Sequence, residues 1–346
     1  MNNKKRKTAN VKSSILILLL IAILLIASTY AWFTANKTVT ISSLDVHVES
    51  ANGLQISSDG SDWKAVLENE DIMPGGTIDS RYAGHTNMIP TELKPVSTIG
   101  EVASGKMKMF LGTVEGDADP ASATYGSDVL TTEALEEAKG TEGKFVAFDI
   151  FLKVDKDTDI VLTKNSDVTA KPNELGEVDD RGLKNAGRVG FVVAADADVQ
   201  AAGASLSAIQ GVVPTTSYIW EPNNNIHTSA AISHGISNYG FTSSTLTTST
   251  VLSSYKGVKA ETEKVLLNAN NSEVFGEVTP AYKTPQGNKT NGTDIDVFSL
   301  KQGITKVRVY LWIEGQDVDC ENTASGANIR YDIQFSVKET PVTPSP

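Results

Sequence analysis

Alternation of apolar and polar residues with a period of two dominates the chain after residue 43. Such alternation predicts β-strands that turn one face to a core and the other to water. The segments that show it are Leu44–Val48, Phe148–Val154, Ile160–Leu162, Val189–Val193, Val307–Ile313 and Ile329–Val337. We therefore predict an all-β fold built from antiparallel sheets that pack face to face.

Helical patterns are few and short. The best one is Thr132–Lys139, which has a threonine at its start and Gly140 as its stop. A further turn or two of helix falls within Thr228–Ile236. Turn-rich stretches separate the predicted strands, so we expect a jelly-roll-like β-sandwich with long insertions and a few short helices.

The first and last alternating strands lie at opposite ends of the chain, and their pairing would make residues 32–338 one β-sandwich domain. The alternative is two sandwiches divided near Ala170–Gly187. Residues 339–346 form a Pro/Thr-rich tail that cannot pair in a sheet. Residues 1–31 have the pattern of a targeting segment.

The targeting segment begins with basic and polar residues 1–14, and thirteen apolar residues, Ile15–Ala27, follow. This order predicts an N-terminal apolar helix that serves as a secretory signal peptide. Thr29 and Ala31 supply the small residues that a signal peptidase requires, so cleavage is predicted immediately before Trp32.

An uncleaved anchor is the alternative, because Ile15–Phe33 is free of charge and long enough to cross about 30 Å of hydrocarbon. In both cases the basic flank stays in the cytoplasm and the domain is exported, so the membrane is contacted only through the N-terminal segment. A single cysteine, Cys320, excludes an internal disulfide framework. We expect an extracellular or cell-surface protein of a Gram-positive bacterium.

Composition and motifs exclude several classes of function. The net charge is −12, and five of the 30 basic residues precede the apolar run. The exported part is therefore strongly acidic and is not expected to bind nucleic acid. The chain has no His-Glu-x-x-His, Gly-x-Ser-x-Gly, Walker or dinucleotide-binding motif. We predict no catalytic residues and no enzyme; a hydrolase with an unrecognised carboxylate site is the least favoured reading.

Two features carry some chemical interest. Asp155, Asp157 and Asp159 recur at alternate positions, as oxygen ligands of calcium can, although the glycine and the bidentate glutamate of an EF-hand are missing. A solvated hairpin turn is the alternative, and no other cofactor is expected. Cys320 lies among carboxylates, which raise the pKa of a thiol and disfavour a catalytic cysteine. The segments Trp220–Asn223 and Leu311–Gly315 stand out, and we interpret both as packing and turn elements.

The segment Ser28–Thr34 resembles the leaders cut by the SipW-type signal peptidase of Firmicutes, which end in Thr-Tyr/Trp-Ala before an aromatic residue. Its substrates include the TasA/camelysin family of biofilm-matrix fibre proteins, which have jelly-roll-like folds. The strand Ser43–Val48 resembles the first strand of that family. The segments Val309–Cys320 and Trp220–Asn223 resemble those of larger clostridial relatives.

This resemblance implies an exported structural or adhesive surface protein, including a biofilm-matrix fibre subunit. After cleavage, Trp32, Phe33, Val39 and Ile41 would lie in a free segment able to pair with the sheet edge of the next subunit. Its partners would be other copies of the chain, other matrix proteins and the signal peptidase. Pairing of the segment within its own domain is the alternative. A membrane-anchored binding module, including a calcium-dependent one, is the competing function.

Overall fold

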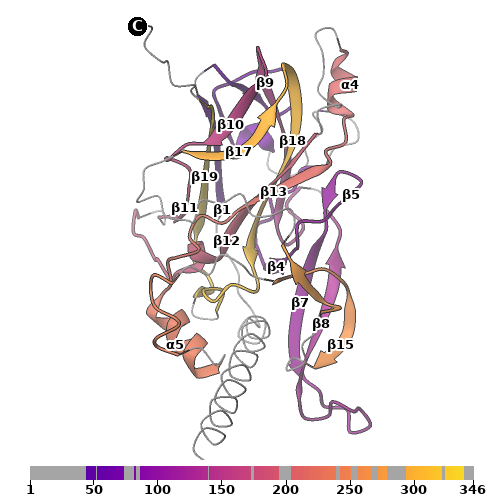
Figure 1. The fold of residues 1–346 in the computed structure, drawn as a ribbon, viewed down its shortest axis with the longest axis vertical. Coiled ribbons are helices and arrows are strands. Elements are labelled where there is room, and N and C mark those ends of the chain that lie inside the picture. The colour runs from indigo at the N-terminus through magenta and orange to yellow at the C-terminus, as the bar shows by residue number, and fades with distance from the viewer. Residues whose placement is uncertain are drawn as a thin grey trace, which may run out of the picture.

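The fold is all-β, as predicted, with mixed sheets and a few short helices (Figure 1). The computed structural model describes residues 44–51, 53–73, 82, 86–138, 140–172, 175–194, 204–238, 242–250, 256–266, 272–278, 294–321 and 324–338. The predicted targeting segment and the Pro/Thr tail therefore lie outside the described residues.

The first sheet has the order β17-β10-β19-β1-β3, with β11 paired beside β10 on the same strand, β19. Its strands are β1 (Leu44–Ala51), β3 (Val66–Glu68), β10 (Thr158–Leu162), β11 (Asp167–Ala170), β17 (Ile295–Leu300) and β19 (Ile329–Val337). All eight residues of β1 pair in parallel with β19, from Leu44 opposite Ile329 onward. The two ends of the described chain thus lie side by side in one sheet.

The second sheet is centred on β18 (Gly303–Glu314), with β12 (Gly187–Val193) on one edge and β9 (Val146–Val154) on the other. β13 (Thr216–Trp220) lies outside β12, and β2 (Gln55–Ser57) lies outside β9. Beyond the end of β9, β4 (Pro95–Ser97) pairs in parallel with β18.

From β4 the second sheet continues as an arm that extends away from β9 and β10 (Figure 1). The arm contains β7 (Met109–Gly116), β8 (Asp128–Leu135) and β15 (Thr262–Leu266). The remaining elements are β5 (Val102–Ala103), β6 (Lys106–Met107), β14 (Lys256–Val258), β16 (Phe275–Glu277), α3 (Asn69–Ile72), α4 (Leu206–Gln210), α5 (Ser229–Asn238) and the 3₁₀ helix η1 (Leu183–Ala186). Within the described ranges, no helix has both the length and the apolar character needed to cross a membrane.

The main core lies between the two sheets and uses the apolar rows that the alternation predicts. Phe191 of β12 contacts Phe335 of β19 with ring centroids 5.3 Å apart, and Phe298 of β17 lies 6.0 Å from each of them. Val46 and Val48 of β1 are fully buried in the same cluster. The six predicted strands are all present, because each offers one continuous apolar row to this core.

The opposite face of the second sheet is also covered, which the alternation does not indicate. Met107, Val96 and Met88 pack there against Trp312 and Tyr310 of β18. β9 is consequently buried along nearly its whole length, including Asp149. The sheets are also mixed rather than antiparallel, because β1 and β4 run parallel to their partners β19 and β18.

The helix predicted over Thr132–Lys139 is wrong. Residues 132–135 belong to β8, where Thr132 lies opposite Gly112 of β7 and opposite Thr262 of β15. The Thr132 hydroxyl donates to the carbonyl of Ala260, 2.7 Å away. Pairing on both edges thus outweighs a local helical preference worth a fraction of a kcal/mol per residue. The helix expected within Thr228–Ile236 is present as α5.

Candidate functional site

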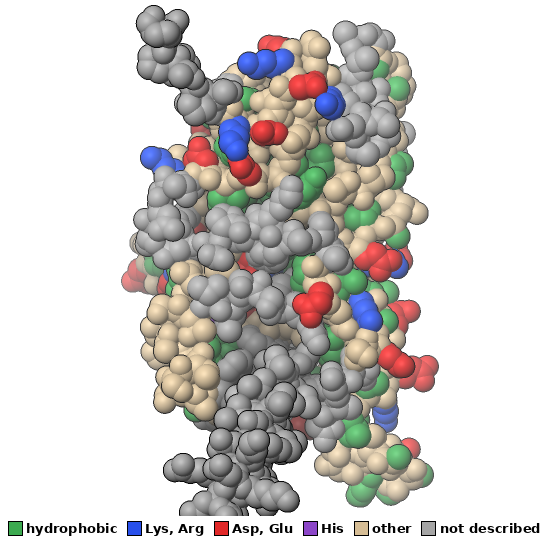
Figure 2. All heavy atoms as spheres, in the orientation of Figure 1, with side chains coloured by type: hydrophobic (Ala, Val, Ile, Leu, Met, Phe, Trp, Pro, Cys, Tyr) green, Lys and Arg blue, Asp and Glu red, His purple; other side chains and the backbone are tan. Residues whose placement is uncertain are grey.

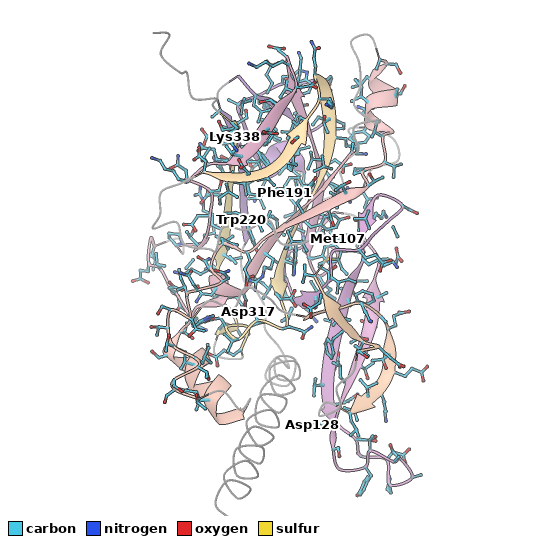
Figure 3. All side chains as sticks on the ribbon, viewed as in Figure 1. Met107, Asp128, Phe191, Trp220, Asp317 and Lys338 are labelled. Carbon is cyan, nitrogen blue, oxygen red and sulfur yellow. The ribbon has the colours of Figure 1, made fainter. Side chains whose placement is uncertain are left out.

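The two unusual segments of the sequence meet at one end of the second sheet. β12 lies between β13 and β18, with Val189 opposite both Trp220 and Leu311. Residues that follow β13 and β18 therefore end beside the start of β12, where Trp220 and Asp317 are marked in Figure 3. We call the group of buried polar side chains at this end the acidic cluster; its members are Arg188, Glu221, His227, Glu314, Asp317 and Asp319.

Arg188 is the central cation of the acidic cluster. Its guanidinium forms ion pairs with Glu221 and Asp317, and all three side chains are nearly inaccessible to solvent. The Nη1 atom also donates to the carbonyl oxygens of Asn185 and Gly187, each 3.1 Å away. One arginine thus joins the start of β12 to the segments that follow β13 and β18. Arginine suits this role because it remains charged and presents several donors in one plane.

Carboxylates outnumber cations in the acidic cluster. Glu314 accepts hydrogen bonds from the Trp312 indole and from the Gln316 amide, each 3.1 Å long. Burial raises the pKa of Glu314 to about 7. Burial also raises the pKa of Glu221 to about 8, although the positive charge of Arg188 acts in the opposite direction. Both carboxyl groups therefore bind a proton more tightly than an exposed glutamate does.

His227 connects the acidic cluster to a third segment. Its Nδ1 lies 2.7 Å from the Asp319 carboxylate, and its Nε2 lies 2.8 Å from the carbonyl oxygen of Thr250. Asp319 also accepts from the amide of Thr228 and from the side chain of Asn185. Burial lowers the pKa of His227, but the hydrogen bond and charge of Asp319 outweigh it, so the pKa is raised above its ordinary value.

The acidic cluster is closed to solvent and connects the segments that follow β13 and β18. Cys320 is buried beside it, and burial, followed by the charges of Asp317 and Glu314, raises the pKa of the thiol well above its ordinary value. The thiol is therefore protonated and shielded, in contrast to reactive cysteines. Over the described ranges of the chain, no three His, Cys, Asp or Glu side chains are placed to hold a metal ion.

A second buried ion cluster lies on the covered face of the second sheet. Arg308 of β18 contacts Asp149 of β9 at 2.8 Å and binds both oxygens of Glu137 at 2.6 and 3.0 Å. Arg308 and Asp149 are direct cross-strand partners. This pair was not predicted from the sequence, where the available signal was an opposite charge on each strand within rows expected to face water. Arg308 holds the segment after β8 against the sheet.

The three aspartates predicted as calcium ligands lie where the chain passes from β9 in the second sheet to β10 in the first, so the hairpin turn considered as their alternative is not formed. Asp157 accepts from the Gln302 amide at 2.9 Å and from the Lys301 ammonium at 3.0 Å. Asp159 accepts from the Ser299 hydroxyl at 2.6 Å. Asp157 and Asp159 thus connect this crossover to β17 and the turn after it, and all three aspartates are exposed. Acidic and basic side chains are interspersed at this end of the molecule (Figure 2).

The remaining predicted site residues cannot be placed. Thr29 and Ala31 of the cleavage site, and Trp32, Phe33, Val39 and Ile41 of the donor segment, lie outside the described residues.

Replacing Glu221 by glutamine is expected to change how stability depends on pH. The raised pKa of Glu221 means that the folded protein binds a proton more tightly than the unfolded chain. The free energy of unfolding should therefore fall as the pH rises from about 4.5 to about 8, by at most about 1.4 kcal/mol per pH unit for this group. E221Q should reduce this slope in urea titrations, whereas E115Q, which alters an exposed side chain, should leave it unchanged. An identical slope in E221Q and the wild type would contradict the raised pKa of Glu221.

The chain was compared with known proteins, and no family model, curated protein or solved structure matches it.

Proposed function

We propose that this chain is an exported structural or adhesive protein of a Gram-positive cell surface, with a jelly-roll-like fold and a role as a fibre subunit. The burial of its most reactive side chains supports a structural role. Arg188, Glu314 and Asp319 stabilise loops at the end of a sheet and do not line an open cleft. The extended hydrogen-bonded sheets between residues 44 and 338 are suited to a structural protein.

The observation that carries the fibre proposal is the position of an open sheet edge. β17 is the last strand of the first sheet, and within the described chain it pairs only with β10. β10 in turn pairs with Phe335–Val337, at the end of β19. The chain enters β1 at Leu44, opposite Ile329 at the start of β19. Entry point and open edge therefore lie at opposite ends of the first sheet.

A free segment before Leu44 would meet such an edge in a neighbouring copy. The donor segment, residues 32–43, carries Trp32, Phe33, Val39 and Ile41 as its large apolar side chains. Backbone hydrogen bonds to β17 would provide affinity, and alternate side chains would provide specificity. Because donor and acceptor lie at opposite ends of one sheet, the contact is head-to-tail, and repetition of a head-to-tail contact that does not close gives a filament.

Electron microscopy of the secreted protein tests the proposal. We expect filaments from the mature chain with Trp32 at its N-terminus, monomers after deletion of residues 32–42, and filaments after deletion of residues 339–346, the matched control at the other terminus. A monodisperse monomer under all conditions, unchanged by the first deletion, would contradict donation. Met1 or Asn2 at the N-terminus of a membrane-bound form would favour the anchored binding module.

Cross-linking locates the acceptor edge. Lys37 belongs to the donor segment, and Lys301 follows β17 directly. Filaments grown from a mixture of isotopically light and heavy chains should give Lys37–Lys301 cross-links that join light to heavy chains. Cross-links confined to single chains would show that the segment pairs within its own domain.

A further inference from the structure

Residues 242–250, which we call the threonine strap, lie over the end of the acidic cluster. The strap has the sequence Thr-Ser-Ser-Thr-Leu-Thr-Thr-Ser-Thr and contains no ionisable side chain. Its side chains are exposed, apart from Leu246, which is buried, and Thr250, which is partly buried. Hydrogen bonds within the strap form two local turns, one between Thr242 and Thr245 and one between Thr247 and Thr250.

His227 provides the hydrogen bonds that the structure describes between the strap and the rest of the chain. The backbone amide of His227 donates to the carbonyl of Thr248 at 3.1 Å. The Nε2 atom of its ring lies 2.8 Å from the carbonyl of Thr250. With the buried side chain of Leu246, these two contacts hold the strap against the sandwich. A single titratable residue thus makes both of these polar contacts.

The geometry around the ring requires two protons. A carbonyl oxygen can only accept a hydrogen bond, so Nε2 must carry hydrogen to bind Thr250. Nδ1 faces the Asp319 carboxylate, which already accepts from two other N–H groups. Burial raises the pKa of Asp319, although the hydrogen bonds that it accepts act in the opposite direction. One proton is therefore shared between the ring and the carboxylate. Loss of that proton leaves an acceptor facing an acceptor.

The charged groups that face His227 come from three elements. Asp319 and Asp317 lie on the loop after β18, and Glu221 follows β13. Arg188 of β12 lies behind them and is shared by Glu221 and Asp317. The surroundings of the ring are therefore negative on balance, which favours the imidazolium form. The strap itself contributes no charge.

We propose that His227 is a pH-sensitive latch that holds the threonine strap closed over the acidic cluster when protonated and releases it when deprotonated. The latch is closed below about pH 6.5, where the histidine is protonated whether the strap is open or closed. Because the pKa of His227 is raised in the closed form, closure weakens as the pH rises through that higher value. Opening therefore exposes the acidic cluster as the pH rises.

Hydrogen exchange of the purified protein between pH 6 and pH 9 tests the latch, with rates corrected for the intrinsic effect of pH. The amide of His227 reports on the strap directly, because it donates to Thr248. We expect its protection factor to fall above pH 6.5 by up to about tenfold per pH unit. His227→Gln should lack this pH dependence and show low protection already at pH 6. His47→Gln should behave like the wild type, because His47 is a partly exposed histidine of β1 that pairs with Glu68 of β3.

The wild-type experiment needs no variant and therefore decides the question even if H227Q folds poorly. Protection of the His227 amide that stays constant from pH 6 to pH 9 would overturn the latch. So would full protection in H227Q at pH 6, or loss of the pH dependence in H47Q. NMR titration of the His227 ring gives an independent measurement, since the latch requires a midpoint above the ordinary histidine value of about 6.5.

Discussion

Replacing Arg188 by methionine will lower the free energy of unfolding by about 3–5 kcal/mol at pH 8, the usual cost of removing one partner from a buried ion cluster. Methionine preserves most of the volume but leaves Glu221 and Asp317 without their shared guanidinium. Two backbone carbonyls also lose a donor. The loss should be smaller at pH 5, because the carboxylates can then take up protons in place of the missing charge.

Urea titrations at pH 5 and pH 8 measure this effect. Arg181→Met is the matched control, because Arg181 is about half exposed and pairs with the exposed Asp179. Its cost should remain below about 1 kcal/mol at both pH values. If R188M were no more destabilising than R181M, the acidic cluster would not hold this end of the sheet together.

Replacing Phe335 by alanine should cost a comparable amount, about 3–5 kcal/mol. Phe335 is fully buried on β19 and contacts both Phe191 of the facing sheet and Phe298 of β17. Its removal leaves a cavity where the two sheets meet and where β17, the last described strand of the first sheet, is anchored. The surrounding aromatic rings cannot close such a space without leaving their favoured conformations.

Urea or thermal unfolding gives the measurement, and Val337→Ala provides the control on the same strand. Val337 is only partly buried against the core, so its truncation should cost about 1 kcal/mol. Equal costs for the two variants would contradict the central place of Phe335. Because Phe298 lies on β17, the proposed donation to that strand predicts that F335A also weakens filament formation.

Part of this architecture could be predicted from local patterns. All six alternating segments form strands, because a period of two in the sequence is a period of two in the strand itself. The helix predicted over Thr132–Lys139 failed because local preference did not decide the structure there. Its residues favour a helix locally, and only the partners of β8, which are β7 and β15, decide for a strand.

The candidate site shows the opposite case. Trp220–Asn223 and Leu311–Gly315 were recognised as unusual, but their shared neighbour Arg188 was not. Arg188 reads as one polar position in an alternating strand, and nothing in its neighbours indicates that it is buried. The burial of Arg308 could not be predicted for the same reason, because alternation shows which residues share a face of a sheet but not what covers that face.

The amino-acid sequence by itself determined the strands, the predicted export segment and the acidic character of the chain after that segment, since each depends on residues adjacent in the chain or on their totals. Tertiary structure alone decided which polar residues are buried and which of them meet. The contact of Arg188 with Asp317 spans 129 residues, and that of His227 with Asp319 spans 92. Long-range contacts of this kind depend on the order of strands in a sheet, and local periodicity does not specify that order.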